Sequence, residues 1–357
     1  MLHKIDFYII KKFLGTFFYA IALIISISIV FDVSENIDDF MSKDVPWKAI
    51  VFDYYMNFIP YFANLFSGLF TFIAVIYFTS KLAYDTEIIA ILCSGVSFNR
   101  LMRPYMVGAG VIAIFSYLLG NYVIPPANLK KVEFRNQYIG TATDRSETNI
   151  HRQIEPGLFV YLESFTSEDV GHKFTIEKFV DHQLVSKLTS EYIKWDRGNK
   201  KWVVYNYFIR NFDGSKETII QGVQKDTLLN MKPEDYHVVF NIVETMTLPK
   251  LNAAIDNLKL SGVNTIEYEI EKHKRRAGPF SAFILTIIGV SLASRKVKGG
   301  IGFHLGLGLL MSFSYILFMQ VTTVFTTSGM LAPWMAMWIP NIVYGALAFY
   351  LYKRASR

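Results

Sequence analysis

The chain lacks the sequence patterns of a disulfide framework, a metal site and a nucleotide-binding loop. Its single cysteine, Cys93, excludes an internal disulfide framework. Its seven histidines show no metal-ligand spacing, and the sequence contains neither a Walker A motif nor another glycine-rich nucleotide loop. The sequence therefore predicts no metal, no cofactor and no catalytic site, and any ATP hydrolysis is expected in a separate subunit.

Charge is scarce as well. Only 18% of the 357 residues are charged, whereas 52% are hydrophobic. The net charge of +6 does not indicate nucleic acid, because the basic residues lie in loops beside long apolar runs, where membrane topology explains them. The composition predicts an α-helical membrane protein.

Uncharged runs divide the chain into six predicted transmembrane helices, since about 20 apolar residues cross the hydrocarbon core. The first run is longer than that of a signal peptide, and no cleavage site follows it. Residues 299–352 carry no formal charge and would make about 80 Å of helix, so we expect them to fold back at residues 326–333. The predicted spans are residues 13–31, 56–80, 97–126, 277–294, 301–325 and 333–352.

Lysine and arginine in the short loops predict which side of the membrane each loop occupies. An even number of spans places both termini on one side, and the loops of that side carry most of these basic residues. The short loop on the opposite side has only Lys43 and Lys48. The side predicted to be cytoplasmic carries Lys4, Lys11, Lys12, Lys81, Arg100, Arg103, Arg295, Lys296, Lys298, Lys353, Arg354 and Arg357.

A polar hairpin, residues 81–103, separates the second and third spans, and we expect a small helix within it at about residues 85–95. Asp85 is its expected N-cap, Gly95 its expected stop, and Glu87 falls in the first turn, where the helix dipole favours an anion. Its apolar rows would rest on lipid or neighbouring helices, which spacing alone favours, or would plug into a partner as a coupling helix. These rows contain Ile88, Ile89, Ile91, Leu92 and Val96.

Between the third and fourth spans, the periodicity of residues 129–276 changes to that of strands. The segment DRGNK at 196–200 predicts a hairpin, and the repeated short strands indicate a β-sandwich or jelly roll. KWVVYNYFIR at 201–210 is apolar on both faces, which fits either a strand buried on both sides or a sheet with an apolar concave face. The expected strands are residues 157–164, 173–180, 184–195, 201–210, 217–221 and 236–244.

Two helices are expected at the end of this insert. Proline near the start and glycine near the end delimit the first, at residues 247–262. The second begins at residue 265 and continues into the fourth span, and its basic cluster at 272–276 is expected at the outer membrane boundary. There the cluster either contacts anionic headgroups or is a solvated helix end. The second helix carries two i,i+4 pairs, Glu269/His273 and Glu271/Arg275.

The order of these elements resembles that of the YjgP/YjgQ family, the LptF/LptG permeases of the lipopolysaccharide export transporter. DTEIIAILCSGVSFNRL at 85–101 resembles the family's cytoplasmic coupling segment. LPKLNAAIDNLKLSGVNTIEYEIEKHKRRAGP at 248–279 resembles the segment that leads into the fourth span. GLFVYLES and KWVVYNYFIR lie where the family's jelly roll has similar strands and are more similar to LptG than to LptF, and IDFYIIKKF resembles the family's start.

This resemblance implies a multi-pass permease of the bacterial inner membrane, with six transmembrane helices and an inserted periplasmic jelly roll. Its implied partners are a second LptF/LptG-type chain, a cytoplasmic LptB ATPase dimer, LptC and the periplasmic LptA bridge, and its implied cargo is lipopolysaccharide. The implied domains are an N-terminal membrane half at residues 1–128, the β domain at 129–264 and a C-terminal membrane half at 265–357.

The resemblance also implies roles for single residues. One departure concerns the end of the first span, where some family members have a lysine placed to meet lipid phosphate and this chain has Asp32. The implied ATPase-coupling residues are Glu87, Ile88, Ile91, Leu92 and Gly95. The remaining basic candidates for contact with a lipid headgroup are Lys130, Lys131, Arg135, Arg275 and Arg276.

Two other classes of function stay open. One is an ABC-type permease or mechanotransmitter for another lipid or for a lipoprotein. The other is a membrane-bound enzyme that modifies lipids, which the absence of a catalytic constellation disfavours.

Overall fold

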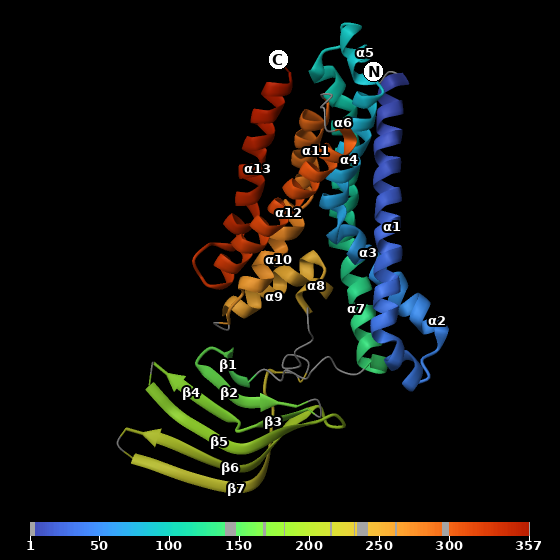
Figure 1. Cartoon of the computed structure of the whole chain (residues 1–357). Helices are drawn as coiled ribbons and strands as arrows, with labels where there is room; N and C mark the ends of the chain where they lie inside the picture. The colour runs from blue at the N-terminus through green and yellow to red at the C-terminus, as the bar shows by residue number, and fades with distance from the viewer. Residues whose placement is uncertain are drawn as a thin grey trace. The chain divides into compact units, whose positions relative to one another are not determined.

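The computed structural model describes residues 4–139, 148–166, 169–181, 183–214, 216–231, 233, 242–260, 263–294 and 300–356 (Figure 1). The chain folds into two compact units. The first, here called the helical unit, combines Met1–Ile139, Val243–Leu251 and Ile266–Arg357. The second, called the sheet unit, combines Gly140–Ile242 and Asn252–Thr265.

The helical unit contains the membrane-spanning part of the protein. Among the described residues, five helices are long and apolar enough to cross a membrane, and a bent pair brings the number to six if it is counted as one span. The six predicted spans are thus confirmed as five to six. They correspond to α1 (Lys4–Ser42), α4 (Ser67–Tyr84), α6 (Phe98–Leu118), α12 (Gly300–Thr327) and α13 (Pro333–Ala355), with α10 (Ile266–Ala277) and α11 (Phe280–Ala293) as the bent pair.

Two of the predicted spans are broken. The second consists of α3 (Met56–Leu65) and α4, which meet at Phe66. The fourth follows directly on the helix that begins near residue 265, as expected, but the two are not one unbroken helix, because α10 and α11 meet at an angle of 48°. Pro279 lies at the bend, where its missing N–H and its ring end the helical hydrogen-bond ladder.

Shorter elements complete the helical unit. The third span continues from α6 through a π-helical turn, η2 (Leu119–Val123), into α7 (Ile124–Phe134) and η3 (Arg135–Ile139). The second span is preceded by α2 (Trp47–Ala49) and η1 (Ile50–Tyr55), and the chain returns to this unit near α8 (Ile242–Thr245) and the start of α9 (Leu248–Leu260). The bounds of α9 confirm the helix predicted at 247–262.

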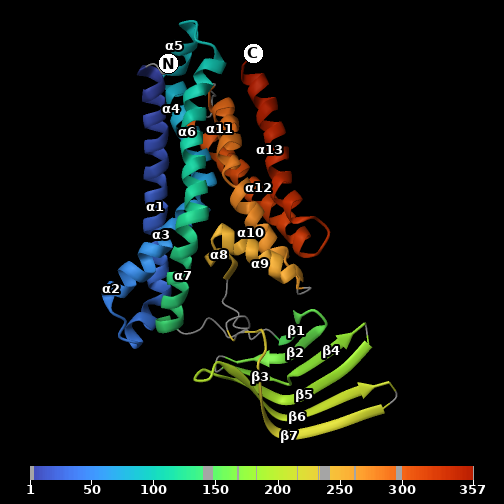
Figure 2. The same cartoon turned by 180° about the vertical axis from the view of Figure 1, so that it is seen from behind.

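Both ends of the helical unit's chain lie together. Figure 1 and Figure 2 show the start of α1, the end of α13 and the small helix α5 (Glu87–Cys93) at one end of the unit, whereas α7 ends at the other. This arrangement agrees with the prediction that both termini and the hairpin at 81–103 share one side of the membrane.

Glycines allow the spans to pack closely. A Cβ added to Gly108 of α6 would lie 2.5 Å from a ring carbon of Phe13 in α1, and one added to Gly308 of α12 would lie 2.6 Å from Ile76 in α4. Small residues serve helix contacts in membranes in this way, because no hydrophobic driving force acts between helices there.

The sheet unit contains one antiparallel sheet of seven strands. The strands follow the order β1-β2-β3-β5-β6-β7, and β4 shares the place of β3 between β2 and β5. Trp202 anchors the core beneath this sheet: it is fully buried, and its indole Nε1 donates a hydrogen bond to the Met231 carbonyl at 3.0 Å. The strands are β1 (Thr148–Glu155), β2 (Leu158–Phe165), β3 (Val170–His172), β4 (Thr175–Val180), β5 (Gln183–Asp196), β6 (Lys201–Asp213) and β7 (Lys216–Thr227).

The inserted all-β region and its main strands are therefore confirmed, including the hairpin of β5 and β6. All described strands belong to one sheet, so the facing sheet of a sandwich is not among them. β6 is buried on both faces near its start, where Val203 and Val204 are both buried. Further along, it exposes an apolar side chain, since Phe208 is half exposed. Each of the two interpretations of its sequence thus holds for part of the strand. The strand expected at 236–244 is wrong at its end, where α8 forms, and its residues 236–241 lie outside the described part of the chain.

Candidate functional site

The hairpin between the second and third spans carries the first candidate site. Its helix, α5, begins at Glu87 and is preceded by Thr86 in the left-handed conformation, with φ of 63°. The expectation that Asp85 caps α5 is therefore wrong; Asp85 instead ends α4. Gly95 follows α5 with φ of +89°, as expected of a helix stop, and the Ser97 side chain caps α6 by accepting from the Arg100 amide.

The two sides of α5 have different environments. Ile88 is fully buried in a cluster with Leu82 and Leu101, and the partly buried Ile91 packs against the same cluster. Ile89 and Leu92 are 45% and 36% exposed. Ile88 was expected to contact the ATPase. Its buried side chain instead fixes α5 to its own chain. The sequence placed Ile89 in an apolar row but did not show that this row, rather than the row of Ile88, faces outward.

Two contacts join this hairpin to the start of α1. Tyr8 interacts with Glu87, which lies in the first turn of α5. The Arg100 guanidinium in α6 donates hydrogen bonds to both carboxylate oxygens of Asp6, at 2.8 and 2.6 Å. The hairpin is therefore held against α1 at the first turn of α5 and at the first turn of α6. Neither contact was anticipated from the sequence, because the residues are far apart along the chain.

The basic candidates from α7 and η3 lie near acidic and aromatic groups. Lys131 is partly buried, and its Nζ lies 5.8 and 5.1 Å from the ring centroids of Phe58 and Tyr61. Arg135 is also partly buried and interacts with the hydroxyl of Tyr54. Lys130 is exposed. The three residues thus share one region of the helical unit, with different access to solvent.

Asp32, the acidic residue at the end of the first predicted span, lies in the same neighbourhood. Its two carboxylate oxygens accept hydrogen bonds from the hydroxyls of Tyr54 and Tyr55, at 3.2 and 3.0 Å. These bonds tie α1 to η1. Hydrogen bonds to an ionised acceptor are stronger than those between neutral groups, so Asp32 serves here as an anchor between segments.

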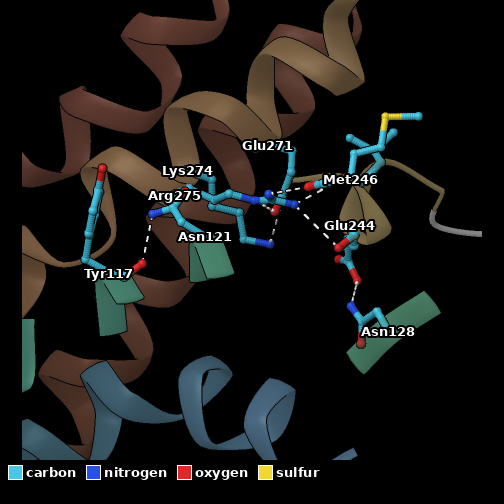
Figure 3. A network of polar contacts seen from close by, with 9 residues as sticks. Tyr117, Asn121, Asn128, Glu244, Met246, Glu271, Lys274 and Arg275 are labelled. Atoms are coloured by element: carbon cyan, nitrogen blue, oxygen red, sulfur yellow. Dashed lines mark hydrogen bonds and ion pairs between the residues drawn. The ribbon is translucent and has the colours of Figure 1, made fainter. Parts of the chain in front are cut away.

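Arg275 was expected to contact a lipid headgroup. Its guanidinium instead donates hydrogen bonds to groups of the protein itself. Only 4% of its side chain is exposed. It donates to the Glu271 carboxylate at 2.7 Å, to the Met246 carbonyl at 2.7 Å and to the Val243 carbonyl at 3.2 Å, as Figure 3 shows in part. The predicted pair with Glu271 is confirmed. The carbonyls could not be anticipated, since they lie 29 and 32 residues upstream.

The surroundings of Arg275 extend into a cavity of about 190 Å³ within the helical unit, with both polar and apolar side chains in its walls. Glu244 of α8 lies on it, with the Asn128 side chain 3.5 Å away (Figure 3). Burial raises the pKa of Glu244, while the positive charge of Lys274 opposes this shift. The buried hydroxyl of Ser312 also lines the cavity and has no hydrogen-bond partner among the described residues. The rest of the lining is largely apolar and includes Leu65, Leu285 and Met319.

Arg276 is the one exposed basic candidate on α10, next to the buried Arg275. The structure therefore separates the five candidates into two exposed residues, Lys130 and Arg276, two partly buried ones, Lys131 and Arg135, and one that is enclosed by the protein. No group of three or more histidine, cysteine, aspartate or glutamate side chains suited to a metal ion occurs among the described residues.

Comparison with known proteins agrees with this architecture. The model of the family described as "Lipopolysaccharide export system permease LptF/LptG" matches residues 7–354, which is nearly the whole chain and includes both units. It covers LptF and LptG together and does not distinguish them. The search of curated proteins gives no match. Because the family match extends from the first span to the last, the chain belongs to the LptF/LptG family of lipopolysaccharide export permeases.

Proposed function

We propose that this chain is a transmembrane subunit of an ABC transporter that extracts lipopolysaccharide from the inner membrane and passes it to a periplasmic bridge. A separate cytoplasmic ATPase of the LptB type supplies the energy, and a second LptF/LptG-type chain completes the membrane part. The family match supports a permease. The observation that carries the mechanism is α5, a short helix with one face fixed to its own chain and another face exposed.

In this mechanism α5 receives the movement of the ATPase. Ile89 and Leu92 form the exposed apolar contact, and Glu87 at the first turn offers a carboxylate to a basic group of the partner. Exposed apolar side chains that stand together mark interaction sites more often than scattered ones do. Because Ile88 holds α5 against the membrane helices, a push on this helix passes to α4 and α6 rather than bending the hairpin alone.

At the opposite end of the helical unit, basic residues are proposed to meet the phosphates of lipopolysaccharide. Lys130 and Arg276 are exposed. Lys131 follows Lys130 in the sequence, and Arg135 interacts electrostatically with Lys131. A cation near an anionic headgroup contributes about 1 kcal/mol. We assign Arg275 to the support of this region, because its donors are already occupied by protein groups.

The sheet unit is proposed to receive the lipid and to pass it on through LptC and LptA. Among the described residues β7 pairs only with β6, so its outer edge is available to another strand. β6 and β7 also expose the apolar side chains Phe208, Ile219, Ile220 and Val223. Acyl chains or a partner's apolar surface would cover them.

Recovery of the ATPase with the membrane complex tests the coupling step. Replacing both Ile89 and Leu92 by Asp should reduce recovery by at least tenfold, because charged groups would enter an apolar contact. Glu87→Lys should also reduce it, since an interface charge pair can contribute 2–5 kcal/mol if it is buried. Ser94→Asp is the matched control: it adds a charge to an exposed position of the same hairpin without removing an apolar side chain. Equal recovery of all variants at matched membrane levels would refute the coupling role of α5.

Orientation has a test of its own. The excess of lysine and arginine around the hairpin predicts that β7 lies outside the cytoplasm. Thr218→Cys in a Cys93→Ser background places the only thiol on an exposed part of this strand. An impermeant reagent should label it in intact spheroplasts. Protection in intact spheroplasts followed by labelling after lysis would reverse the proposed topology.

A further inference from the structure

A groove of about 920 Å³ opens between α6 and α13 of the helical unit, and both helices pack against α11 behind it. Side chains of all three helices make its walls apolar. The main ones are Met102, Met106, Ile284, Ile287, Ala348 and Phe349. Neither the proposed ATPase contact nor the proposed headgroup contact uses this surface.

The position of the groove limits what fits it. It lies where α6 begins and α13 ends, the end of the helical unit that also contains α5 (Figure 2). Its lining extends from Tyr352 back to Gly345, about 10 Å along the helix axis. This is about one third of the roughly 30 Å hydrocarbon core. A transmembrane helix of a partner would need a surface along the whole span, so a groove this short suits part of a lipid better.

Charge at the mouth of the groove selects the kind of lipid. Arg103 lines the mouth, is exposed and forms no ion pair with a residue that the structure describes. Lys353 is close by, with its Nζ 4.7 Å from the ring centroid of Phe349. Arg100 also lines the groove, but its guanidinium already holds Asp6. None of the described residues that line the groove is acidic, so no carboxylate there would pair with the cationic group of choline or ethanolamine, and Lys353 already lies over the ring of Phe349.

We propose that this groove binds one anionic phospholipid of the leaflet at this end of the helices. The phosphate lies between Arg103 and Lys353, and an acyl chain follows Met106 and Ile287 toward the membrane centre. The ligand has to be anionic at the mouth and apolar inside, and a phospholipid with a net negative charge combines both properties. The site is separate from the lipopolysaccharide contact, so it stands or falls independently of the transported cargo.

Gly345 gives a way to close the groove without disturbing the fold. A Cβ added there meets nothing within 4 Å, although Gly345 belongs to the groove lining. Gly345→Leu therefore places a side chain into the groove. Gly306→Leu is the matched control, because Gly306 of α12 also has open space around its Cβ position and does not line the groove.

The experiment uses the complex, purified with its native partners and placed in nanodiscs. The discs contain either phosphatidylglycerol or phosphatidylcholine with the same photoreactive diazirine in one acyl chain, and crosslinked peptides are mapped by mass spectrometry. We expect phosphatidylglycerol to label residues 102–107 and 345–352 about fivefold more strongly than phosphatidylcholine does, since a basic residue near an anionic surface contributes roughly 1 kcal/mol. Arg103→Gln should remove this preference, and Gly345→Leu should reduce labelling by both lipids.

Other results would overturn the proposal. Equal labelling of the wild-type groove by the two lipids would remove the anionic selectivity. Labelling that neither Arg103→Gln nor Gly345→Leu changes, or that Gly306→Leu reduces equally, would show that the lipid lies elsewhere. A peptide of a partner chain crosslinked to a photoreactive residue at position 349 would identify the groove as a protein interface instead. Thermal unfolding of each variant, compared with Gly306→Leu, separates loss of binding from loss of fold.

Discussion

Arg100 and Asp6 form a two-fold hydrogen-bonded ion pair, with distances of 2.8 and 2.6 Å between their nitrogen and oxygen atoms. The pair joins the first turn of α1 to the first turn of α6, which belongs to the hairpin that carries α5. Its partners differ in burial: 5% of the Asp6 side chain is exposed, compared with 26% of the Arg100 side chain. A paired arrangement of arginine and carboxylate fixes orientation as well as distance.

This difference in burial predicts unequal effects of the two single changes. Arg100→Gln should lower the melting temperature of the detergent-solubilised complex more than Asp6→Asn does, because it leaves a buried carboxylate without its cation. After Asp6→Asn the guanidinium can still reach solvent. Thermal unfolding followed by near-ultraviolet circular dichroism measures both. An equal effect, or a larger one for Asp6→Asn, would contradict the role of Asp6 as the buried partner.

The membrane spans could be predicted from the sequence because each is an uncharged run, and charge is expensive in hydrocarbon. The hairpins of the sheet were equally legible where glycine and polar residues separate apolar strands, as at residues 196–200. β1 was missed because TNIHRQIE is polar and lacks clear alternation. The bend between α10 and α11 was missed because Pro279 allows either a start or a kink of a helix.

The candidate sites were less predictable, because periodicity shows which residues share a face but not what covers that face. Ile88 and Leu92 both belong to apolar rows of α5, and only packing shows that Ile88 is the covered one. In the same way, Arg275 and Arg276 are adjacent basic residues that the sequence does not distinguish. Only the fold shows that the chain near Met246 covers Arg275 and leaves Arg276 exposed.

The two sides of α5 should respond differently to truncation. Ile88→Ala should destabilise the protein by about 2–5 kcal/mol, since it removes a fully buried side chain from a packed cluster. Leu92→Ala should change stability little, because Leu92 is 36% exposed, yet should weaken recovery of the ATPase. Chemical unfolding and co-purification are measured on the same preparations. If Ile88→Ala unfolds like wild type, α5 is not fixed to the membrane helices as the structure shows.

Gly108 and Gly110 offer a matched comparison on one helix. A Cβ at Gly108 would lie 2.5 Å from the buried ring of Phe13, whereas one at Gly110 would lie 3.8 Å from Phe283. Overpacking costs about 1–3 kcal/mol, and replacing glycine by alanine inside a helix gains about 1 kcal/mol. We therefore expect Gly108→Ala to be neutral or destabilising by up to about 2 kcal/mol, and Gly110→Ala to be stabilising. A stabilising Gly108→Ala would show that α1 and α6 pack less closely than described.

The adjacent residues Arg275 and Arg276 separate a structural role from lipid contact. Arg275→Ala should destabilise the protein by about 3–5 kcal/mol, because it removes a buried cation from the Glu271 carboxylate and from two backbone carbonyls. Arg276→Glu should leave stability within about 0.5 kcal/mol, since Arg276 is exposed. It should nevertheless reduce photocrosslinking of lipopolysaccharide to the complex severalfold. The change replaces a cation that contributes about 1 kcal/mol near an anionic headgroup by an anion that repels the headgroup.

Lys250→Glu on the exposed start of α9 is the matched charge reversal outside the candidate set. Crosslinking that falls equally with Arg276→Glu and Lys250→Glu would indicate a general effect of net charge, and crosslinking that falls with neither would exclude Arg276 from the lipid path.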